Sequence, residues 1–428
     1  MQRFHVHNFG CRASQADGAA LETALAAKGL EASDSTQADI VVLNTCTVTA
    51  TADDDVRQKI RRVHRENPDA RILVTGCYAQ RAPEELVGLP GVRWVIGNSH
   101  KTQIPRLLDE PVPYHGFVQV GDIFEQHDFF SAPVEDAAGH RTRPNLKIQD
   151  GCNNRCSFCI IPFVRGRSRC APADQVIDQI RYLATRYREV VLSGINLGRW
   201  GREPGSTVRL ADLICRVLNE TEIERLRLSS VEPMDWSDDL LDLVATSPRI
   251  AKHVHAPLQS GSDTVLRRMH RKYRPRHYED RIKRARALMP NAAIGADVMV
   301  GFPGESEAEF EESRAYIESL PFTYLHVFTY SERPGTPAAE NANQIAMPVR
   351  KTRNRILRDL AAQKNLEFRR AMLGKTLSAV TLDHGALTGN YLQVELATPR
   401  PANELIEIEI GGVTPAGLRE HSSLLVIQ

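Results

Sequence analysis

Residues 151–159 read Gly151-Cys152-Asn153-Asn154-Arg155-Cys156-Ser157-Phe158-Cys159, and they follow the stretch Leu146–Gln149, which we expect to form a strand. The Cys-x3-Cys-x2-Cys spacing lets one loop wrap three thiolates around one face of a [4Fe–4S] cluster. With three protein ligands, one iron stays open to the donor atoms of a small molecule. The alternatives are a zinc site or three buried thiols, but zinc usually takes four ligands and no fourth partner lies close by in the sequence.

Three further cysteines stand near the N-terminus, each after a short apolar run. Cys11 follows Phe4–Phe9, Cys46 follows Ile40–Leu43, and Cys77 follows Ile72–Thr75. In a parallel sheet the carboxyl ends of the strands lie along one edge, where ligands bind. We therefore expect these three thiols to converge and to hold a second [4Fe–4S] cluster, which would also have an open iron. The remaining cysteines, Cys170 and Cys215, are expected to bind no metal.

The N-terminal cysteines belong to a segment, residues 1–112, in which strand-like runs alternate with helix-like stretches such as Ala16–Lys28 and Asp53–Glu66. This alternation predicts an α/β fold with a doubly wound parallel sheet. Residues 138–368 repeat the alternation and predict a partial (β/α)6 barrel, with its active site at the C-terminal ends of the strands. The six expected strands are Leu146–Gln149, Glu189–Leu192, Arg225–Leu228, His253–Ala256, Ala293–Val300 and Tyr324–Phe328.

The C-terminal part has a different pattern. Residues 345–374 predict one long basic helix, and residues 371–428 are rich in β-forming residues and poor in helix signals. The expected strands there are Ser378–Leu382, Tyr391–Glu395, Ile406–Ile410 and Leu424–Ile427. This pattern predicts a small β-barrel of the oligonucleotide-binding type.

The composition of the 428 residues is that of an ordinary globular protein, with 42% apolar and 25% charged residues. The net charge of +1 means that any nucleic-acid surface must be a local patch. No apolar run reaches the roughly 20 residues that a membrane span needs, and the N-terminus lacks the apolar core of a signal peptide. We therefore expect a cytoplasmic protein without a membrane partner, in which disulfides are rare and cysteines serve other purposes.

Together the motifs resemble the methylthiotransferase family of radical S-adenosylmethionine (SAM) enzymes, over essentially the full length. Besides the cysteine motifs, the stretches that carry the resemblance are residues 44–49, 160–162, 229–233, 257–263, 297–305 and 330–337. The resemblance implies two [4Fe–4S] clusters and SAM as cofactors, a C-terminal TRAM domain that binds RNA, and no catalytic residues beyond the cluster ligands. It implies that one SAM, bound at the cluster of Cys152, Cys156 and Cys159, is cut to a radical. A second SAM donates the methyl group, and the other cluster holds or supplies the sulfur.

Residues 44–49 and 192–198 are most similar to the branch of the family that methylthiolates C2 of N6-threonylcarbamoyladenosine at position 37 of tRNA. Other branches modify isopentenyladenosine-37 of tRNA or an aspartate of ribosomal protein S12, and both stay open as alternatives. A non-catalytic RNA-binding protein is disfavoured, because a binding module has no need for an open iron. The implied partners are the tRNA anticodon loop and an electron donor such as a flavodoxin or ferredoxin. In one departure from the family, Ser14 and Ala16 replace the usual Asn and Tyr after Cys11.

SAM needs a polar cradle at the strand ends. Gly194 allows close approach of a ligand to the backbone, whereas Glu232, Gln259 and Asp297 can hydrogen-bond the SAM ribose or methionyl group or orient the RNA base. Ordinary packing is the alternative for each of them. Arg165, Arg167 and Arg169, after the cysteine loop, could meet RNA phosphates or the SAM carboxylate, or could lie in a solvated basic loop.

Two basic runs suggest where RNA binds. Residues 267–286 interleave arginines and lysines with Tyr273, and residues 350–375 interleave them with Phe368. Basic side chains can contact phosphates while aromatic rings stack on bases. The alternative for either run alone is a solvated helix face. A base in the anticodon loop is unpaired, so presenting it to an enzyme costs less than flipping it from a duplex.

Overall fold

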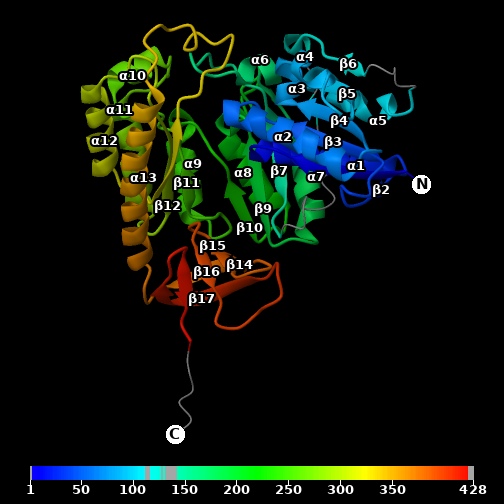
Figure 1. The fold of residues 1–428 in the computed structure, drawn as a ribbon. Coiled ribbons are helices and arrows are strands. Elements are labelled where there is room, and N and C mark those ends of the chain that lie inside the picture. The colour runs from blue at the N-terminus through cyan, green and yellow to red at the C-terminus, as the bar shows by residue number, and fades with distance from the viewer. Residues whose placement is uncertain (1, 111–115, 127–128, 131–141, 423–428) are drawn as a thin grey trace.

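The structure is a computed structural model that describes residues 2–110, 116–126, 129–130 and 142–422. Figure 1 shows three parts along the chain: an N-terminal sheet with its helices, a central half-open barrel, and a small barrel at the bottom. The domain borders predicted at residues 112 and 138 lie in segments outside the described residues, and all the predicted borders stay predictions. No helix within the described ranges is long and apolar enough to cross a membrane.

The N-terminal part is a six-stranded, wholly parallel sheet of order β2-β1-β3-β4-β5-β6. Its strands are β1 (Arg3–Asn8), β2 (Glu31–Ala32), β3 (Ile40–Thr45), β4 (Arg71–Gly76), β5 (Val92–Gly97) and β6 (Phe117–Gln119). Its helices are α1 (Arg12–Ala27), α2 (Ala50–Glu66), α3 (Cys77–Arg81), α4 (Glu84–Val87), α5 (Ile104–Leu107) and the 3-10 turns η1 (Asn98–Gln103) and η2 (Ile123–Glu125).

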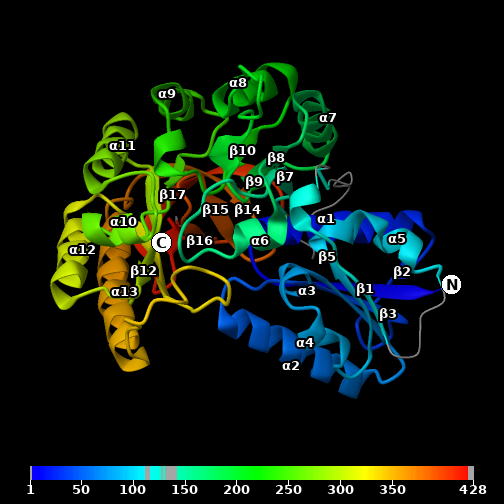
Figure 2. The same cartoon turned by 90° about the horizontal axis from the view of Figure 1, so that it is seen from above.

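Alternating side chains of this sheet pack on opposite faces. Val41 and Leu43 join the core beneath α2, whereas Ile40 and Val42 join the core beneath α1. Because successive side chains of a strand point to opposite faces, a strand that is apolar throughout requires helices on both sides. The predicted doubly wound α/β sheet is therefore confirmed (Figure 2).

The central part is a partial barrel of six parallel strands in two hydrogen-bonded groups. The strands are β7 (Asn145–Asp150), β9 (Glu189–Gly194), β10 (Arg225–Leu228), β11 (His253–His255), β12 (Ala293–Val300) and β13 (Tyr324–Thr329). A parallel bridge between Leu226 and Ile250 joins the two groups. All six predicted strands are confirmed, with a short addition, β8 (Arg169–Cys170), that pairs antiparallel with β7.

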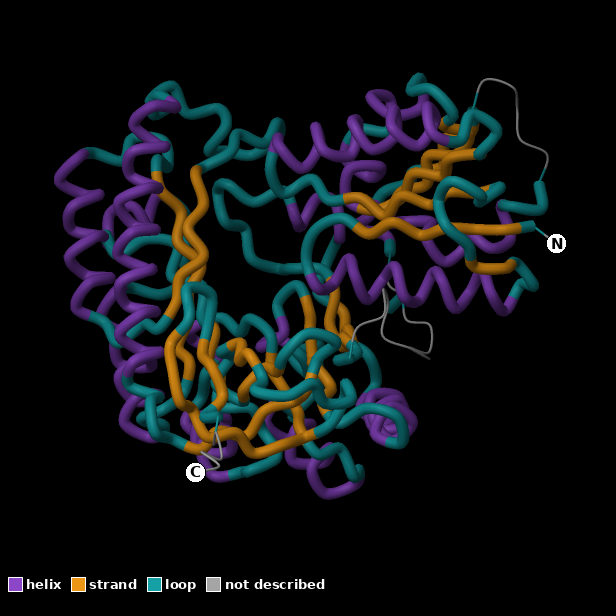
Figure 3. Tube along the Cα trace, turned by 60° about the horizontal axis from the view of Figure 1, so that its bottom comes forward, coloured by secondary structure: helices purple, strands orange, loops and turns teal. Residues whose placement is uncertain are grey.

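Helices cover the outside of this barrel, as the tube view in Figure 3 shows. They are α6 (Ile161–Arg165), α7 (Ala173–Ala184), α8 (Leu210–Glu220), α9 (Asp238–Thr246), α10 (Asp263–Arg268), α11 (Pro275–Leu288), α12 (Glu307–Ser319) and α13 (Met347–Arg370), with the turns η3 (Leu197–Arg199) and η4 (Pro233–Asp235). Val254, Ile294 and Ala296 pack outward into this helical core. The neighbouring residues of the same strands, among them His255 and Asp297, therefore face the inside of the barrel.

The C-terminal part is a closed five-stranded barrel of order β14-β15-β16-β18-β17. Its strands are β14 (Thr376–Thr381), β15 (Ala386–Thr388), β16 (Gln393–Glu395), β17 (Leu405–Val413) and β18 (Leu418–Glu420). The predicted strand Leu424–Ile427 lies outside the described residues. Arg227 of β10 fixes the small barrel against the central one, because its guanidinium donates to Glu189 and to the carbonyls of Thr388 and Gly389.

Candidate functional site

The first set of thiols comes from three neighbouring strand ends. Cys11 caps the N-terminus of α1 after β1, Cys46 follows β3, and Cys77 begins α3 after β4. Burial, and after it the nearby Cys77 and Cys11 thiols, raise the pKa of Cys46 to about 12. A Cβ atom at Gly10 would lie only 2.8 Å from Cys46 Sγ, so this residue must be glycine for the loops to close. The three thiols thus stand at neighbouring strand ends, and their joint role as ligands of one cluster stays a prediction.

The second set lies in the loop between β7 and α6. The backbone N–H of Cys159 donates to the Cys156 carbonyl at 3.1 Å, and Asn154 N–H donates to Cys152 Sγ at 3.4 Å. The pKa of Cys159 is raised to about 12. Burial is the largest cause, and the Cys156 thiol and, to a smaller extent, the Cys152 thiol add to it. The loop therefore folds back so that its three thiols face one another.

The spacing of the thiols distinguishes the two kinds of metal centre. In a zinc site, three thiolates at about 2.3 Å from one ion lie about 3.8 Å from one another. Among the described residues, the ligand atoms of His255, Asp297 and His326 lie within 4.8 Å of one another and could hold a metal ion. Neither set of three cysteines forms such a group. Neither set of thiols is therefore drawn together as three ligands of one zinc ion would be. The residues present thus fit one [4Fe–4S] cluster in each set.

The two sets are neighbours in space. Cys77 packs in one apolar cluster with Ile160, Ile161 and Val164, the residues that follow Cys159. Asn98 bridges the same contact, because its amide donates to Cys77 Sγ at 3.6 Å and to the Val164 carbonyl at 2.8 Å. The first thiol set thus lies beside the helix that begins where the second set ends.

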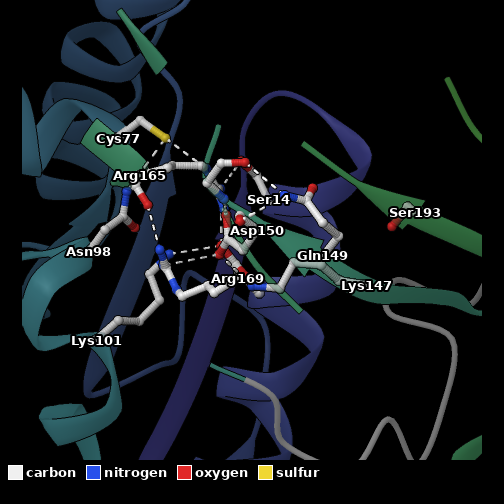
Figure 4. Close-up of polar contacts among 12 residues, drawn as sticks. Ser14, Cys77, Asn98, Lys101, Lys147, Gln149, Asp150, Arg165, Arg169 and Ser193 are labelled. Atoms are coloured by element: carbon white, nitrogen blue, oxygen red, sulfur yellow. Dashed lines mark hydrogen bonds and ion pairs between the residues drawn. The ribbon is translucent and has the colours of Figure 1, made fainter. Parts of the chain in front are cut away.

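Arg165 connects Cys77 to a buried network of charged side chains, which Figure 4 shows. Its Nε lies 3.3 Å from Cys77 Sγ, and its other nitrogens donate to Asp150 and Asp17 at 3.0 Å each. Arg165 is only 1% exposed, so the alternatives of an RNA-facing or a solvated side chain are wrong. The sequence places Arg165 next to the cysteine loop but does not show that a carboxylate of α1 draws it inward.

Lysines complete this network. Asp17 accepts from Lys101 at 3.0 Å and from Lys147 at 2.5 Å, and Lys147 also donates to Asp150 at 2.9 Å. Burial alone would raise the pKa of Asp17, but Lys101, Lys147 and Arg165 hold it well below the usual range. Buried ion pairs are stable only when every charge has partners. Asp17 and Lys147 therefore fasten α1 of the first sheet to β7 of the central barrel.

Ser14 belongs to this network as well. Its hydroxyl accepts from Arg165 at 3.1 Å and lies 3.8 Å from Cys11 Sγ. The departure from the family pattern at this position therefore leaves a polar group between the first thiol set and Arg165. Ala16 is 5% exposed and packs in the interior of α1.

Glu232 serves the second set through another arginine. Arg271 donates to Cys156 Sγ at 3.2 Å and to Glu232 at 2.5 Å, and it is 7% exposed. Each thiol set is thus contacted by one buried arginine that carboxylates hold in place. Sequence reasoning missed Arg271, since it stands in a run of basic residues that predicted an RNA surface.

The other predicted SAM contacts lie on the same barrel. A Cβ at Gly194 would lie 2.9 Å from Gln149, so Gln149 of β7 occupies the space beside this glycine. Gln259 has a positive φ of 65°, and its backbone pairs with residues 297 and 299 of β12. These residues and Glu232 come from the carboxyl ends of successive strands, as predicted. Their contact with SAM stays a prediction.

Asp297 lies at the centre of a hydrogen-bonded chain inside the barrel. Its Oδ1 lies 3.3 Å from His255 Nε2 and 3.1 Å from His326 Nδ1. Tyr324 Oη lies 2.8 Å from His255 Nδ1 and 2.6 Å from His253 Nε2. Burial alone would raise the pKa of Asp297, but the bonds from His255 and His326 hold it well below its usual value. Period-two alternation of polar residues on these strands was the signal that could have identified this chain.

Much of the predicted RNA surface has a structural role instead. Tyr273 and Phe368 are 1% and 8% exposed, so they cannot stack on bases as predicted. Arg350, Arg353 and Arg369 are also buried, and they donate to Tyr330, to Glu305 and to Thr414. The basic residues that stay exposed on α13 are Lys351, Arg355, Arg358 and Arg370.

A hollow of about 370 Å³ adjoins the second thiol loop. Asn153 and Asn154 of the loop line it, together with the cations Arg199, Arg202 and Lys272. Asp235 pairs with Arg199 at 2.9 Å and with Arg202 at 3.1 Å. The hollow is therefore a basic depression next to Cys152.

Comparison with known proteins agrees with this geometry. Residues 3–97 match the model of uncharacterized protein family UPF0004, and residues 146–317 match that of the radical SAM superfamily. The chain is 36% identical to threonylcarbamoyladenosine tRNA methylthiotransferase MtaB of Aquifex aeolicus, covering 94% of this chain and 98% of the relative. It is 40% identical to the MtaB of Bacillus subtilis, covering 85% and 81%. The structure of TsrM, a radical SAM methyltransferase from Kitasatospora setae, has the same fold, with a TM-score of 0.57 at 16% identity over 79% of this chain and 77% of that one.

Proposed function

The chain belongs to the methylthiotransferase family of radical SAM enzymes, and we propose that it transfers a methylthio group to C2 of N6-threonylcarbamoyladenosine at position 37 of tRNA. The observation that carries this proposal is the contact of Cys77 with the helix that follows Cys159. A sulfur held at the first set and a radical generated at the second must meet at one carbon. The packing of Cys77 against the helix after Cys159 would keep the two thiol sets close enough for this.

The two cysteine sets would hold the clusters, and the barrel would hold SAM. When bound, these cofactors supply the radical chemistry that an unactivated aromatic C–H bond requires. The chain supplies position and charge. Arg165 and Arg271 each donate an N–H to a ligand sulfur, which stabilises negative charge on that sulfur. Asp17 and Lys147 hold α1, and with it Cys11, against the barrel.

Gly194, Glu232, Gln259 and Asp297 are proposed to surround SAM and the adenine. Glu232 is proposed to act mainly through Arg271, since its carboxylate is already bonded to that guanidinium. Asp297 and its histidines lie on the inner barrel face, where the base must enter.

Partners are proposed from the exposed charges. The tRNA anticodon loop is proposed to meet the basic residues of α13 and the small barrel, which Arg227 fixes to the central barrel. An electron donor such as a flavodoxin or ferredoxin is proposed to reach the second set from the basic hollow beside Cys152. A tRNA substrate, unpaired cysteines and such a reductant are all consistent with a cytoplasmic enzyme.

Nucleoside mass spectrometry of tRNA from cells with and without this gene tests the proposed reaction. Loss of 2-methylthio-N6-threonylcarbamoyladenosine, with a rise of its unthiolated precursor, is the expected result. If instead 2-methylthio-N6-isopentenyladenosine disappeared, the enzyme would belong to the other tRNA branch. Unchanged methylthio nucleosides, with loss of the modification on ribosomal protein S12, would contradict a tRNA substrate.

A further inference from the structure

We propose that Arg12 and His326 recognise the threonylcarbamoyl group of the substrate. Arg12 would pair with the carboxylate of that group, and His326 would accept a hydrogen bond from it. This inference rests on the proposed function, because it takes threonylcarbamoyladenosine as the substrate. The group offers an anion, a hydroxyl and ureido N–H groups, whereas an isopentenyl group offers none of these. Arg12, beside β7 of the barrel, and His326, on the inner face of the barrel, each have a matching hydrogen-bonding capacity that no described residue uses.

Arg12 is the first such group. It begins α1 directly after Cys11, and its carbonyl accepts from the Asn145 amide of β7 at 2.5 Å. Among the described residues its guanidinium has no hydrogen bond or ion pair, although the side chain is partly buried. It lies close enough to the inner barrel face to lower the pKa of His253, together with burial, Arg227 and His255. A partly buried cation without a carboxylate partner is a site for an anion.

The surroundings of Arg12 favour a negative ligand. Three guanidiniums converge on the single carboxylate of Glu189: Arg227 at 2.7 Å, Arg143 at 3.2 Å and Arg225 at 3.8 Å. Arg12 adds to this excess and lowers the pKa of Arg143, after burial and the effect of Arg227. The base of the barrel therefore carries more positive than negative charge. An apolar substituent here would leave Arg12 without compensation, whereas a carboxylate would pair with it.

His326 is the second group, and its hydrogen-bonding state follows from its partners. Asp297 is ionised and can only accept, so His326 Nδ1 and His255 Nε2 must both donate to it. His255 Nδ1 then accepts from Tyr324 Oη, which in turn accepts from His253 Nε2. With neutral imidazoles the chain runs in this direction, and His326 Nε2 is left as an acceptor.

This acceptor is open to a ligand. His326 is 50% exposed although it sits on the inner face of β13, between Tyr324 and Phe328, with ring centroids 5.3 Å and 6.5 Å away. No described residue bonds to its Nε2. The threonyl hydroxyl can donate to it. An isopentenyl substituent would leave Arg12 and His326 without a partner, so these two residues favour the threonylcarbamoyl group over it.

The test uses anticodon stem-loop RNA that carries one of three nucleosides at position 37. These are N6-threonylcarbamoyladenosine, its carboxyl methyl ester, and the glycine analogue, which lacks the hydroxyl-bearing side chain. Methylthiolation is measured as kcat/KM with the reconstituted holoenzyme. The wild type is expected to prefer the acid over the ester by about tenfold to a hundredfold, the usual effect of a hydrogen bond to a charged group.

The variants isolate each contact as a ratio within one enzyme. Arg12→Met is expected to lose the preference for the acid over the ester, and Arg12→Lys to retain part of it. The wild type is expected to prefer the threonylcarbamoyl RNA over the glycine analogue by about tenfold, and His326→Phe is expected to lose this preference. The same variant should keep the preference for the acid over the ester. Arg181→Met, on the outer helix α7, is the matched control and is expected to keep both ratios. Iron content checks that the neighbouring Cys11 still binds its cluster.

The outcomes separate the two proposals. A wild type that fails to modify the threonylcarbamoyl RNA would overturn both the proposed function and this recognition site. A wild type that modifies it, combined with an Arg12→Met variant that keeps the full acid preference, would overturn the recognition by Arg12 alone. An unchanged glycine-analogue ratio in His326→Phe would do the same for His326.

Discussion

The Nε atom of Arg165 lies 3.3 Å from the Sγ atom of Cys77, although 88 residues separate the two along the chain. Cys77 belongs to the N-terminal sheet, and Arg165 ends the helix that follows the second cysteine loop. The contact therefore joins one thiol set to the loop that carries the other. Because Arg165 also holds Asp17 and Asp150, a change at this residue should affect both the first cluster and the attachment of the sheet to the barrel.

Arg165→Gln is expected to destabilise the protein by roughly 3–5 kcal/mol, since it leaves buried carboxylates without a partner. It should also lower the iron bound at the first thiol set. Chemical unfolding and iron analysis measure the two effects. Arg167→Gln is the matched control, because Arg167 is exposed in the same loop. An Arg165→Gln variant with wild-type stability and iron content would contradict the role of this network.

Removal of one thiol from either set should cost about four iron atoms, which corresponds to one [4Fe–4S] cluster. Cys46→Ala and Cys159→Ala are expected to give half the iron of the wild type, each with a single remaining cluster by Mössbauer or EPR spectroscopy. Cys215→Ala, on the exposed face of α8, is the control and should keep all the iron. A single zinc ion recovered in place of iron at either set would refute the cluster assignment.

Glu232→Gln distinguishes a residue that acts through Arg271 from one that contacts SAM. Loss of the carboxylate leaves the positive charge of Arg271 less compensated beside Cys156. The midpoint potential of the second cluster should then rise by about 60 mV, the one-electron equivalent of a tenfold change in equilibrium. Redox titration followed by EPR, without SAM, gives this potential, and Glu222→Gln on the surface is the control. A variant whose spectrum changes only when SAM is added would favour a direct contact.

The stability of the cluster-free protein should fall at alkaline pH. Burial, helped by the neighbouring thiols, raises the pKa of Cys46 and of Cys159 from 9.0 to about 12. A raised pKa in the folded state means that the unfolded state releases its proton first, so stability is full below about pH 9 and decreases as the pH rises toward 12. The slope is about 1.4 kcal/mol per pH unit for each such thiol. Chemical unfolding at several pH values measures it, with a shallower slope expected for Cys46→Ala.

Arg227 should control the attachment of the small barrel. Arg227→Met removes its bonds to Glu189, Thr388 and Gly389, so the small barrel loses a buried anchor. We expect a loss of about 3 kcal/mol in stability and faster proteolysis between α13 and β14. Limited proteolysis with mass analysis locates the cut. Arg181→Met, which changes an exposed ion pair on α7, is the control and should be cleaved like the wild type. If Arg227→Met were also cleaved like the wild type, Arg227 would not anchor the small barrel.

Local sequence was sufficient for the elements and for the cysteines that are proposed as metal ligands. Apolar runs such as Ile40–Leu43 and Ile72–Thr75 predicted strands because a strand buried on both faces must be apolar throughout. The cysteines that follow them converge because neighbouring parallel strands end at the same edge. The Cys-x3-Cys-x2-Cys loop is local by nature, so Cys152, Cys156 and Cys159 could be assigned directly.

The partners of charged side chains were settled only by the tertiary structure. A basic run looks the same in sequence whether an arginine is solvated or bonded to a buried sulfur, as Arg271 and Arg165 show. Burial depends on which distant carboxylate, here Glu232 or Asp17, the fold brings within reach. The same holds for His326, whose free acceptor nitrogen follows from three strands meeting at Asp297. Sequence therefore determined the scaffold and the proposed cluster cysteines, whereas long-range packing decided the electrostatic environment, because charge partners need only be close in space.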